Sequence, residues 1–315
     1  MKEKFKTTIY GAIIGDALGV PVEFTSRKSR KQNPVVDMIG FGAYPFPAGT
    51  WSDDTSMSLC LIDSIGDKKV IDYKDIMQRF SDWANYARYT SDNKVFDIGG
   101  SCRKSIQNFC NNVPVLQCGQ RSERDNGNGS LMRIAALPFY LSFKYGSEVT
   151  DNEEAFNVIH NVSSLTHAHN ISLIGCDIYC TLMLEVIAGN REKVEIQKNA
   201  YNIIKKYVNT HSEFKYAFEK YCRIGSADFI NLSEDMIKSS GYIVDSLEAS
   251  LWCFLNTNNY KDCVLKAVNL GEDTDTIACI AGSIAAAYYN EIPSEWKNKI
   301  RNKSLIDSIL KKWDI

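Results

Sequence analysis

Apolar side chains recur at helical spacing along most of the chain, beginning with residues 7–20, where they share one face until Pro21 interrupts the pattern. Further helices are predicted at residues 54–65, 73–89, 102–109, 153–165, 170–188, 193–208, 212–222, 244–256, 260–270, 277–288 and 294–313. Segments that alternate apolar and polar residues are almost absent, and no repeat of 20–50 residues is visible. We therefore predict an all-α protein that forms one compact domain over residues 1–315.

Glycines in the first predicted helix recur every four residues, at Gly11, Gly15 and Gly19. This spacing places them on one face, where another helix can approach closely. It does not match a dinucleotide-binding fingerprint, because the spacing differs and no strand precedes it. Residues 25–50, in contrast, are rich in proline and glycine, and we expect a long loop there that could act as a lid. The basic run at residues 27–31 is expected to be a solvated part of that loop.

Composition and charge exclude several classes of protein. The 315 residues are 44% hydrophobic and 23% charged, with a formal net charge of -2, which gives no basic footprint for nucleic acid or an anionic membrane. None of the ten cysteines forms a Cys-x-x-Cys pair, and most fall in apolar helical patterns, as free thiols do in a reducing cytoplasm. No apolar run approaches the roughly 20 residues that span a bilayer. We expect a cytoplasmic protein without nucleic-acid or membrane partners.

Two short acidic segments each precede an apolar helical pattern. They are Ser52-Asp53-Asp54-Thr55 and Asp273-Thr274-Asp275-Thr276, from opposite ends of the chain. Adjacent carboxylates repel one another and are costly to bury without a partner, whereas divalent cations make such a cluster tolerable. Oxygen ligands without His or Cys favour Mg²⁺ or Mn²⁺ over zinc. The two segments therefore predict a site for two metal ions.

Other interpretations of these segments remain. Asp, Ser and Thr are favoured at helix N-termini, so either cluster alone could be a helix cap. The second cluster is similar to the Asp-x-Asp-x-Thr loop of haloacid-dehalogenase-type phosphatases, but Ile277 stands where that loop needs Thr. An EF-hand beginning at Asp125 fails because its twelfth position is Ala136 rather than Glu.

Two glycine-containing segments and one histidine are further candidates. Gly99-Gly100-Ser101 begins a predicted helix, where exposed backbone N–H groups can bind phosphate, although many such starts only turn the chain. Asn128-Gly129-Ser130 enters an apolar run and could equally be a turn. His167 could contact a ligand or be a hydrogen-bonded structural residue.

These motifs, in this order, resemble the ADP-ribosylglycohydrolase family, which includes the ADP-ribosylarginine hydrolases. The resemblance is closest to the dinitrogenase-reductase-type branch of this family. The matching segments are Gly15-Asp16-Ala17-Leu18-Gly19-Val20-Pro21-Val22-Glu23, Trp51-Ser52-Asp53-Asp54-Thr55, Phe96-Asp97-Ile98-Gly99, Asn128-Gly129-Ser130-Leu131-Met132-Arg133, Thr166-His167-Ala168-His169 and Asp273-Thr274-Asp275-Thr276. The resemblance implies an orthogonal all-α bundle with two Mg²⁺ or Mn²⁺ ions at the base of an ADP-ribose cleft.

By motif position, the resemblance also implies roles for individual residues. The implied metal ligands are Ser52, Asp53, Asp54, Asp273, Asp275 and Thr276. The implied substrate-binding residues are Ile98, Gly99, Gly100, Ser101, Asn128, Gly129, Ser130 and His167. Asp97 and Glu23 match carboxylates near the scissile bond, so they are the implied catalytic pair. Glu272 departs from the family pattern, where Gly is common, and must point outward or alter metal affinity.

The activity that follows from this resemblance is hydrolysis of ADP-ribose from a modified protein side chain, with arginine as the favoured attachment and ADP-ribose as product. Two metals can hold ribose hydroxyls and activate water, while a carboxylate acts as general acid or base. The alternatives are a hydrolase of O-linked ADP-ribose on serine, a polymer or a small metabolite, and a relative that binds ADP-ribose without hydrolysing it.

Overall fold

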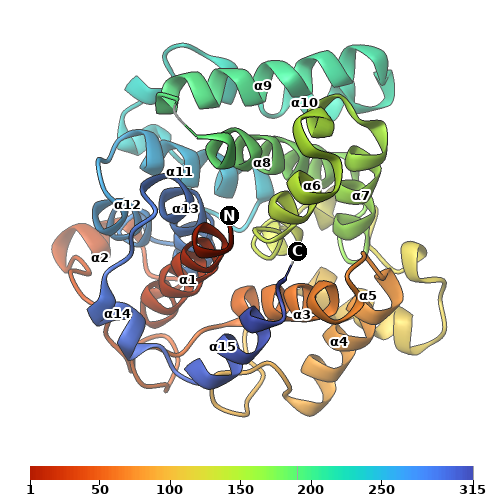
Figure 1. The fold of residues 1–315 in the computed structure, drawn as a ribbon. Helices are drawn as coiled ribbons and strands as arrows, with labels where there is room; N and C mark the ends of the chain where they lie inside the picture. Colours follow the sequence, from red (N-terminus) through yellow and green to blue (C-terminus); the bar gives the residue numbers. More distant parts are fainter. Residues whose placement is uncertain (190, 315) are drawn as a thin grey trace.

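Helices form all the extended regular structure in residues 1–189 and 191–314, which the computed structural model describes (Figure 1). The α-helices are α1 Lys2–Gly19, α2 Arg27–Gln32, α3 Asp53–Lys68, α4 Tyr73–Tyr86, α5 Gly100–Cys110, α6 Leu137–Tyr145, α7 Glu153–Ser164, α8 Asn170–Ala188, α9 Lys193–Thr210, α10 Lys215–Glu219, α11 Ile243–Leu255, α12 Tyr260–Val268, α13 Thr274–Tyr289, α14 Ser294–Lys299 and α15 Lys303–Lys311. In this part of the chain β-pairing is limited to two isolated bridges. The predicted all-α class is confirmed.

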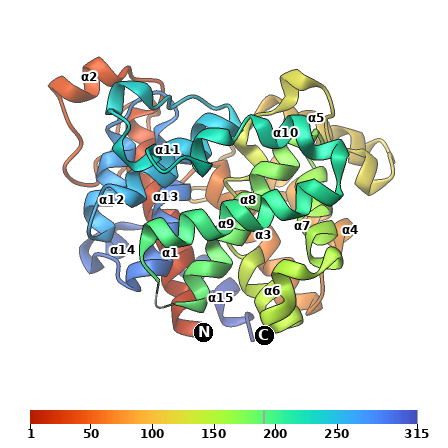
Figure 2. The ribbon, with the colours of Figure 1, turned by 90° about the horizontal axis from the view of Figure 1, so that it is seen from above.

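Helices α1 and α13 lie side by side in the middle of the bundle (Figures 1 and 2). Their backbones approach so closely that a Cβ atom added at Gly15 would lie 2.0 Å from the Ala278 carbonyl oxygen. A Cβ added at Gly19 would lie 2.3 Å from the Asp275 backbone. The close helix contact that the glycine spacing predicts is therefore present. The close contact brings the C-terminal end of α1 against the N-terminal end of α13, where the second acidic segment lies.

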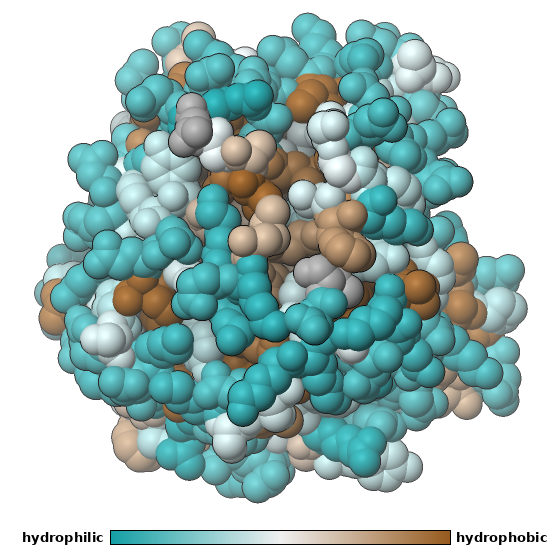
Figure 3. All heavy atoms as spheres, viewed as in Figure 1, coloured by the Kyte–Doolittle hydropathy of each residue, from teal (hydrophilic) through white to brown (hydrophobic). Residues whose placement is uncertain are grey.

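The long helix α8 has enough length and apolar character to span a membrane, contrary to the expectation from the sequence. In the fold, however, 89% of its apolar window is buried. It packs against α6, α7, α9, α11 and α13, so its apolar surface is covered by protein. Much of the surface of the molecule is hydrophilic on the face that Figure 3 shows. We interpret α8 as a core helix.

Three segments differ from their predicted form. The basic run at residues 27–31 belongs to helix α2, because Ser26 caps its N-terminus and Arg27 hydrogen-bonds to the carbonyls of Leu270, Glu234 and Ile237. Residues 212–222 do not form one helix: 3-10 turns flank the short α10. The helix predicted at residues 294–313 is split into α14 and α15, because Asn302 adopts a left-handed backbone with φ of 47°.

Candidate active site

A cavity of about 380 Å³ opens where the N-terminal ends of α3, α5 and α13 meet. Three helix N-termini directed at one hollow give it a positive backbone potential, which favours anionic groups. The residues that line it are Glu23, Phe24, Asp53, Asp97, Gly99, Gly100, Ser101, Cys102, Gly127, Asn128, Gly129, Met132, His167, Ser240, Gly241, Glu272, Asp273 and Thr276.

The first acidic segment is held in place by Asp16, a fully buried residue of α1. The Asp16 carboxylate accepts hydrogen bonds from the Ser52 backbone N–H at 3.0 Å and from the Thr55 backbone N–H and hydroxyl at 3.1 and 2.5 Å. Ser52 is the N-cap of α3 and also donates to Asp54 Oδ2 at 3.1 Å. The start of α3 is thus capped both by its own serine and by a carboxylate from another helix.

The second acidic segment meets the first at the floor of the cavity. Thr276 Oγ1 donates to Asp54 Oδ2 at 3.2 Å, which links α13 directly to α3. Asn128 Nδ2 donates to Asp273 Oδ2 at 2.7 Å and so orients that carboxylate. Two segments separated by more than two hundred residues therefore form one acidic centre.

The acidic centre fits hard divalent cations. Two groups of carboxylates have oxygen atoms within 4.8 Å of one another: Asp16, Asp54 and Asp275 in one, and Glu23, Asp273 and Asp275 in the other. Asp54 Oδ1, Asp275 Oδ2 and Glu23 Oε2 are buried without a hydrogen-bond partner. Burial, with the neighbouring carboxylates, raises the pKa of Asp54 and Asp275 well above the usual range. Carboxylates packed this closely could hold a cation, and an all-oxygen donor set is of the kind that Mg²⁺ and Mn²⁺ prefer.

Glu23 and Asp97 form a second pair of carboxyls at the wall of the cavity. Burial, Asp97 and Asp273 together raise the pKa of Glu23 to about 9, whereas burial raises the pKa of Asp97 to about 6. The Tyr44 hydroxyl lies beside both carboxyls, and its own pKa is raised by burial and by their charges. The pKa of Glu23 is raised further than that of Asp97, so the two carboxyls ionise at different pH, which suits an acid and a base acting on one bond.

The start of α5 offers an open backbone to a ligand. A Cβ atom added at Gly99 or Gly100 would meet no protein atom within 4 Å, so these glycines face the cavity. Helix α5 has no side-chain cap, and its first N–H groups are available to an anion. Gly129 packs against Cys102 of α5 and against His167. His167 is buried, and burial together with the Arg133 charge lowers its pKa to about 3, so the ring is neutral.

The structure brings most of the residues named from the sequence to this cavity. Glu23, Asp53, Asp97, Gly99, Gly100, Ser101, Asn128, Gly129, His167, Asp273 and Thr276 line it. Ser52, Asp54 and Asp275 do not line the cavity: their hydrogen bonds and burial place them in the acidic floor beneath it. Ser130 is fully buried and accepts a hydrogen bond from the Cys176 thiol at 3.5 Å. Ile98 lines a separate hollow with Arg103 and Cys110.

The structure also adds residues that sequence reasoning did not name for the site. Asp16 lies in the matched family motif, but a single Asp inside a helical pattern gave no sign of its contacts with α3. Tyr44 lies in the proline- and glycine-rich loop, where no spacing marks it. Cys102 is expected from the sequence only in an apolar helical pattern, and Met132 belongs to a matched family motif without a role of its own, yet both line the cavity. Glu272 is exposed at the rim, and its φ of 62° explains why Gly suits this position.

The family profile described as ADP-ribosylglycohydrolase matches residues 1–314, so the chain belongs to this family of glycosidic-bond hydrolases. A solved structure described as an ADP-ribosylglycohydrolase-related protein complex superposes with a TM-score of 0.76 over 99% of this chain and 96% of that one, at 24% identity. That likeness supports the same fold.

Three named relatives match nearly the whole chain, and one of their names states the arginine linkage. ADP-ribosylarginine hydrolase Tri1 of Pseudomonas putida (strain GB-1) is 29% identical over 95% of this chain and 74% of its own. The ADP-ribosyl-[dinitrogen reductase] glycohydrolase of Rhodospirillum rubrum is 29% identical over 93% of this chain and 88% of its own. ADP-ribosylhydrolase ARH3 of Gallus gallus is more distant, at 23% identity over 93% of this chain and 88% of its own.

Proposed function

We propose that this protein is a metal-dependent hydrolase that removes ADP-ribose from modified protein side chains, with N-linked arginine as its substrate linkage. The observation that supports this most strongly is the acidic centre below the cavity. Buried carboxylate oxygens of Asp54 and Asp275 without partners lie directly beneath a hollow lined by helix N-termini. Such a site combines a place for divalent cations with a place for a diphosphate.

In this proposal Mg²⁺ or Mn²⁺ ions would be held by side chains of the acidic centre. The sequence resemblance implies two such ions. The residues that would hold them are Ser52, Asp53, Asp54, Asp273, Asp275 and Thr276, together with Asp16, which the structure adds. When bound, such cations supply Lewis-acid polarisation. The Gly99 and Gly100 backbone and Ser101 would bind the diphosphate, and Asn128, Gly129 and His167 would line the ribose.

Glu23 and Asp97 are the groups proposed to move protons. The protonated Glu23 carboxyl can donate to the leaving nitrogen as the anomeric bond breaks. The Asp97 carboxylate can accept a proton from the attacking water. Tyr44 lies against both carboxyls and can hold their relative orientation. General acid–base catalysis of this kind typically contributes ~10²–10⁴-fold.

The arginine linkage is supported by the relatives that are named for it, at 26–29% identity across nearly the whole chain. The test is hydrolysis of arginine-linked and serine-linked ADP-ribose on matched peptides, with Mg²⁺, with Mn²⁺ and with chelator. We expect release of ADP-ribose from the arginine peptide only in the presence of metal. Release from neither peptide under any condition would remove the proposal.

A hydrolase of O-linked ADP-ribose is the second candidate, which the sequence resemblance leaves open; the relative named ADP-ribosylhydrolase ARH3, at 23% identity over 93% of this chain, is not named for arginine. The same assay separates the two. Faster release from the serine peptide, with slow or no release from the arginine peptide, would favour this candidate and leave the metal site unchanged.

A further inference from the structure

A second hollow, of about 680 Å³, lies on the other side of Glu23 from the cavity. It is formed by residues 21–25 after α1, by α2 and by the loop up to residue 43, and we call it the flanking groove. Glu23 lines both hollows, so the flanking groove begins at the carboxyl that the proposed function places beside the scissile bond. A leaving group that departs past Glu23 would enter it.

Exposed apolar side chains gather along the flanking groove. Val36 and Phe41 are 69% and 74% exposed and Ile39 is 45% exposed, and the 69% exposed Phe24 lines the neighbouring cavity. Phe24 and Phe41 have φ angles of 63° and 58°, and hydrogen bonds from their N–H groups to Glu272 O and Phe46 O fix this backbone. The rings are thus presented to solvent by an ordered backbone. An apolar patch of this kind beside a site indicates a binding surface.

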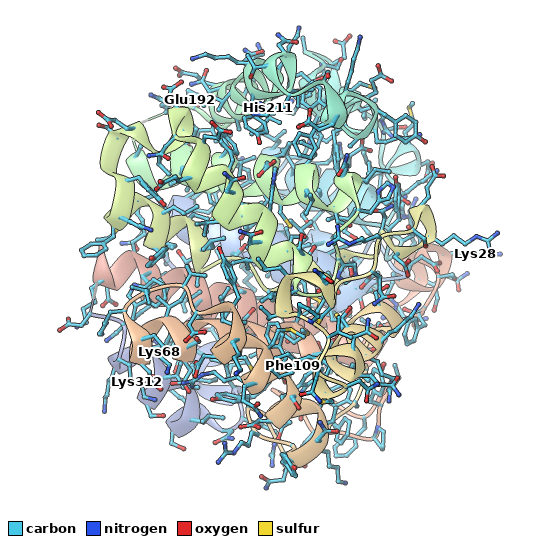
Figure 4. All side chains as sticks on the ribbon, turned by 90° about the vertical axis from the view of Figure 1, so that its right-hand side faces the viewer. Lys28, Lys68, Phe109, Glu192, His211 and Lys312 are labelled. Atoms are coloured by element: carbon cyan, nitrogen blue, oxygen red, sulfur yellow. The ribbon has the colours of Figure 1, made fainter. Side chains whose placement is uncertain are left out.

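The rim of the flanking groove has positive charge without an acidic partner. Arg30 lines the groove, and its Nε atom is buried with no hydrogen-bond partner. Lys28, on the same helix α2, projects from the edge of the molecule (Figure 4). Neither forms an ion pair within the described residues. Two acidic residues, Glu23 and Asp37, also line the groove, and Asp37 is paired with Lys299 at 2.8 Å. Arg30 and Lys28 are therefore available to a carboxylate of a bound segment.

We propose that the flanking groove binds the polypeptide on one side of the modified residue, and that it selects segments with a bulky apolar residue and a carboxylate. This inference rests on the proposed function and adds to it a preference for the sequence next to the modified residue. A small leaving group needs no second hollow beyond Glu23. An extended segment, in contrast, would cover Phe41 and Val36 and would place its carboxylate near the Arg30 guanidinium group.

The test compares four substrates with ADP-ribose on one arginine. One is free ADP-ribosyl-arginine; three are peptides with the arginine flanked by Leu and Phe and by Glu, Gln or Lys. The wild-type protein should prefer the Glu peptide and disfavour the Lys peptide. Arg30→Glu should reverse that order, and Phe41→Ser should lower kcat/KM for all three peptides by about tenfold, the loss expected for one exposed aromatic contact. Both variants should hydrolyse free ADP-ribosyl-arginine at the wild-type rate.

Matched controls lie far from the groove in the sequence. Phe143→Ser removes a comparably exposed ring, 65% exposed, and Lys198→Glu reverses an exposed charge on α9. Neither should change the peptide preference. Binding of the unmodified Glu peptide to the Asp53→Asn variant, followed by fluorescence anisotropy, gives a readout that needs no turnover, and Arg30→Glu should weaken it.

Two outcomes overturn this inference while leaving the proposed function in place. One is equal peptide kinetics for wild type, Arg30→Glu and Phe41→Ser. The other is a wild-type dimer that Phe41→Ser converts to a monomer, with no change in peptide order, because the patch would then join two copies of this chain. Failure of the wild-type protein on free ADP-ribosyl-arginine and on all peptides would instead reject the proposed function.

Discussion

The Asp16 carboxylate on α1 accepts two hydrogen bonds from Thr55 on α3, one from its backbone N–H at 3.1 Å and one from its hydroxyl at 2.5 Å. The same carboxylate belongs to the group of close oxygens with Asp54 and Asp275. Asp16 therefore joins the helix that carries the first acidic segment to the acidic centre itself. Because burial raises its pKa to about 6, this carboxylate needs compensating positive charge at neutral pH.

Replacing Asp16 by Asn should impair metal binding more than it impairs folding. The amide side chain of the Asp16→Asn variant keeps one oxygen for the α3 amides but loses the charge that faces Asp54 and Asp275. We expect Mn²⁺ affinity to fall by at least about tenfold in calorimetric titration. Thr55→Val is the matched control: it removes one hydrogen bond, about 1 kcal/mol of stability, and should keep Mn²⁺ affinity. Equal Mn²⁺ affinity in Asp16→Asn and wild type would show that Asp16 only caps α3.

Gly15→Ala should destabilise the whole fold. Its Cβ would lie 2.0 Å from the Ala278 carbonyl oxygen, so α1 and α13 would have to separate. Overpacking of this kind typically costs about 1–3 kcal/mol, and a clash with backbone should be at the upper end. Urea unfolding followed by circular dichroism measures the loss. Because the acidic segments lie at this contact, activity should fall as well. A variant as stable as the wild type would contradict the close helix contact.

Gly100→Ala should keep the stability of the fold but weaken the binding of ADP-ribose. A Cβ at this position meets no protein atom within 4 Å, so stability should be unchanged or slightly raised, since Ala favours helices. The added methyl group would instead occupy the space above the start of α5, where the diphosphate is proposed to bind. Calorimetry with ADP-ribose should show affinity lowered by about tenfold or more. Wild-type affinity in this variant would place the diphosphate elsewhere.

Much of the fold and of the site follows from local pattern. The Gly11-Gly15-Gly19 spacing predicts a close helix contact, and paired aspartates ahead of two apolar patterns predict two helix starts that share cations; the structure bears out the contact and brings the two starts together. The contribution of Asp16 could not be predicted, because its hydrogen bonds to Ser52 and Thr55 depend on how α1 crosses α3. Sequence spacing alone contains no such information.

Other differences between the sequence prediction and the structure also arise from tertiary contacts. Helix α2 forms within a loop of low helical signal because Arg27 is anchored to carbonyls more than two hundred residues away. Ile98 adjoins Asp97, whose φ of 55° turns the chain, and the Ile98 side chain lines a different hollow from the glycines that follow. A motif assigns a role to a run of residues, whereas the backbone decides which members face the cavity.

A buried carboxyl outside the site predicts a pH dependence of stability. Burial raises the pKa of Glu248 to about 7, although Arg223 lies 3.1 Å away and Asp245 and Lys238 are near. Since the folded-state pKa is above the unfolded value, this group stabilises the fold at low pH, and that contribution is lost as pH rises from about 4.5 to about 7. Between pH 5 and 8 the wild type should lose on the order of 2 kcal/mol relative to Glu248→Gln. Exposed Glu291→Gln should follow the wild type, and parallel curves for wild type and Glu248→Gln would refute the shift.

Removal of metal should reverse the stability order of wild type and Asp275→Asn. Without cations, the buried Asp54 and Asp275 carboxyls can ionise together only against mutual repulsion, so replacing one of them by an amide should raise the free energy of unfolding by about 1 kcal/mol or more. With saturating Mg²⁺ the wild type should gain stability through binding, by about 2.7 kcal/mol at a hundredfold excess over Kd, and the variant much less. Activity should be lost in Asp275→Asn while its helical circular dichroism is retained. The exposed Asp228→Asn serves as control and should match the wild type under both conditions. Repulsion that cations relieve predicts that the stability order of the two proteins changes when Mg²⁺ is added. If Asp275→Asn were less stable than the wild type in thermal or urea unfolding both with and without Mg²⁺, the Asp275 carboxylate would instead stabilise the fold without cations.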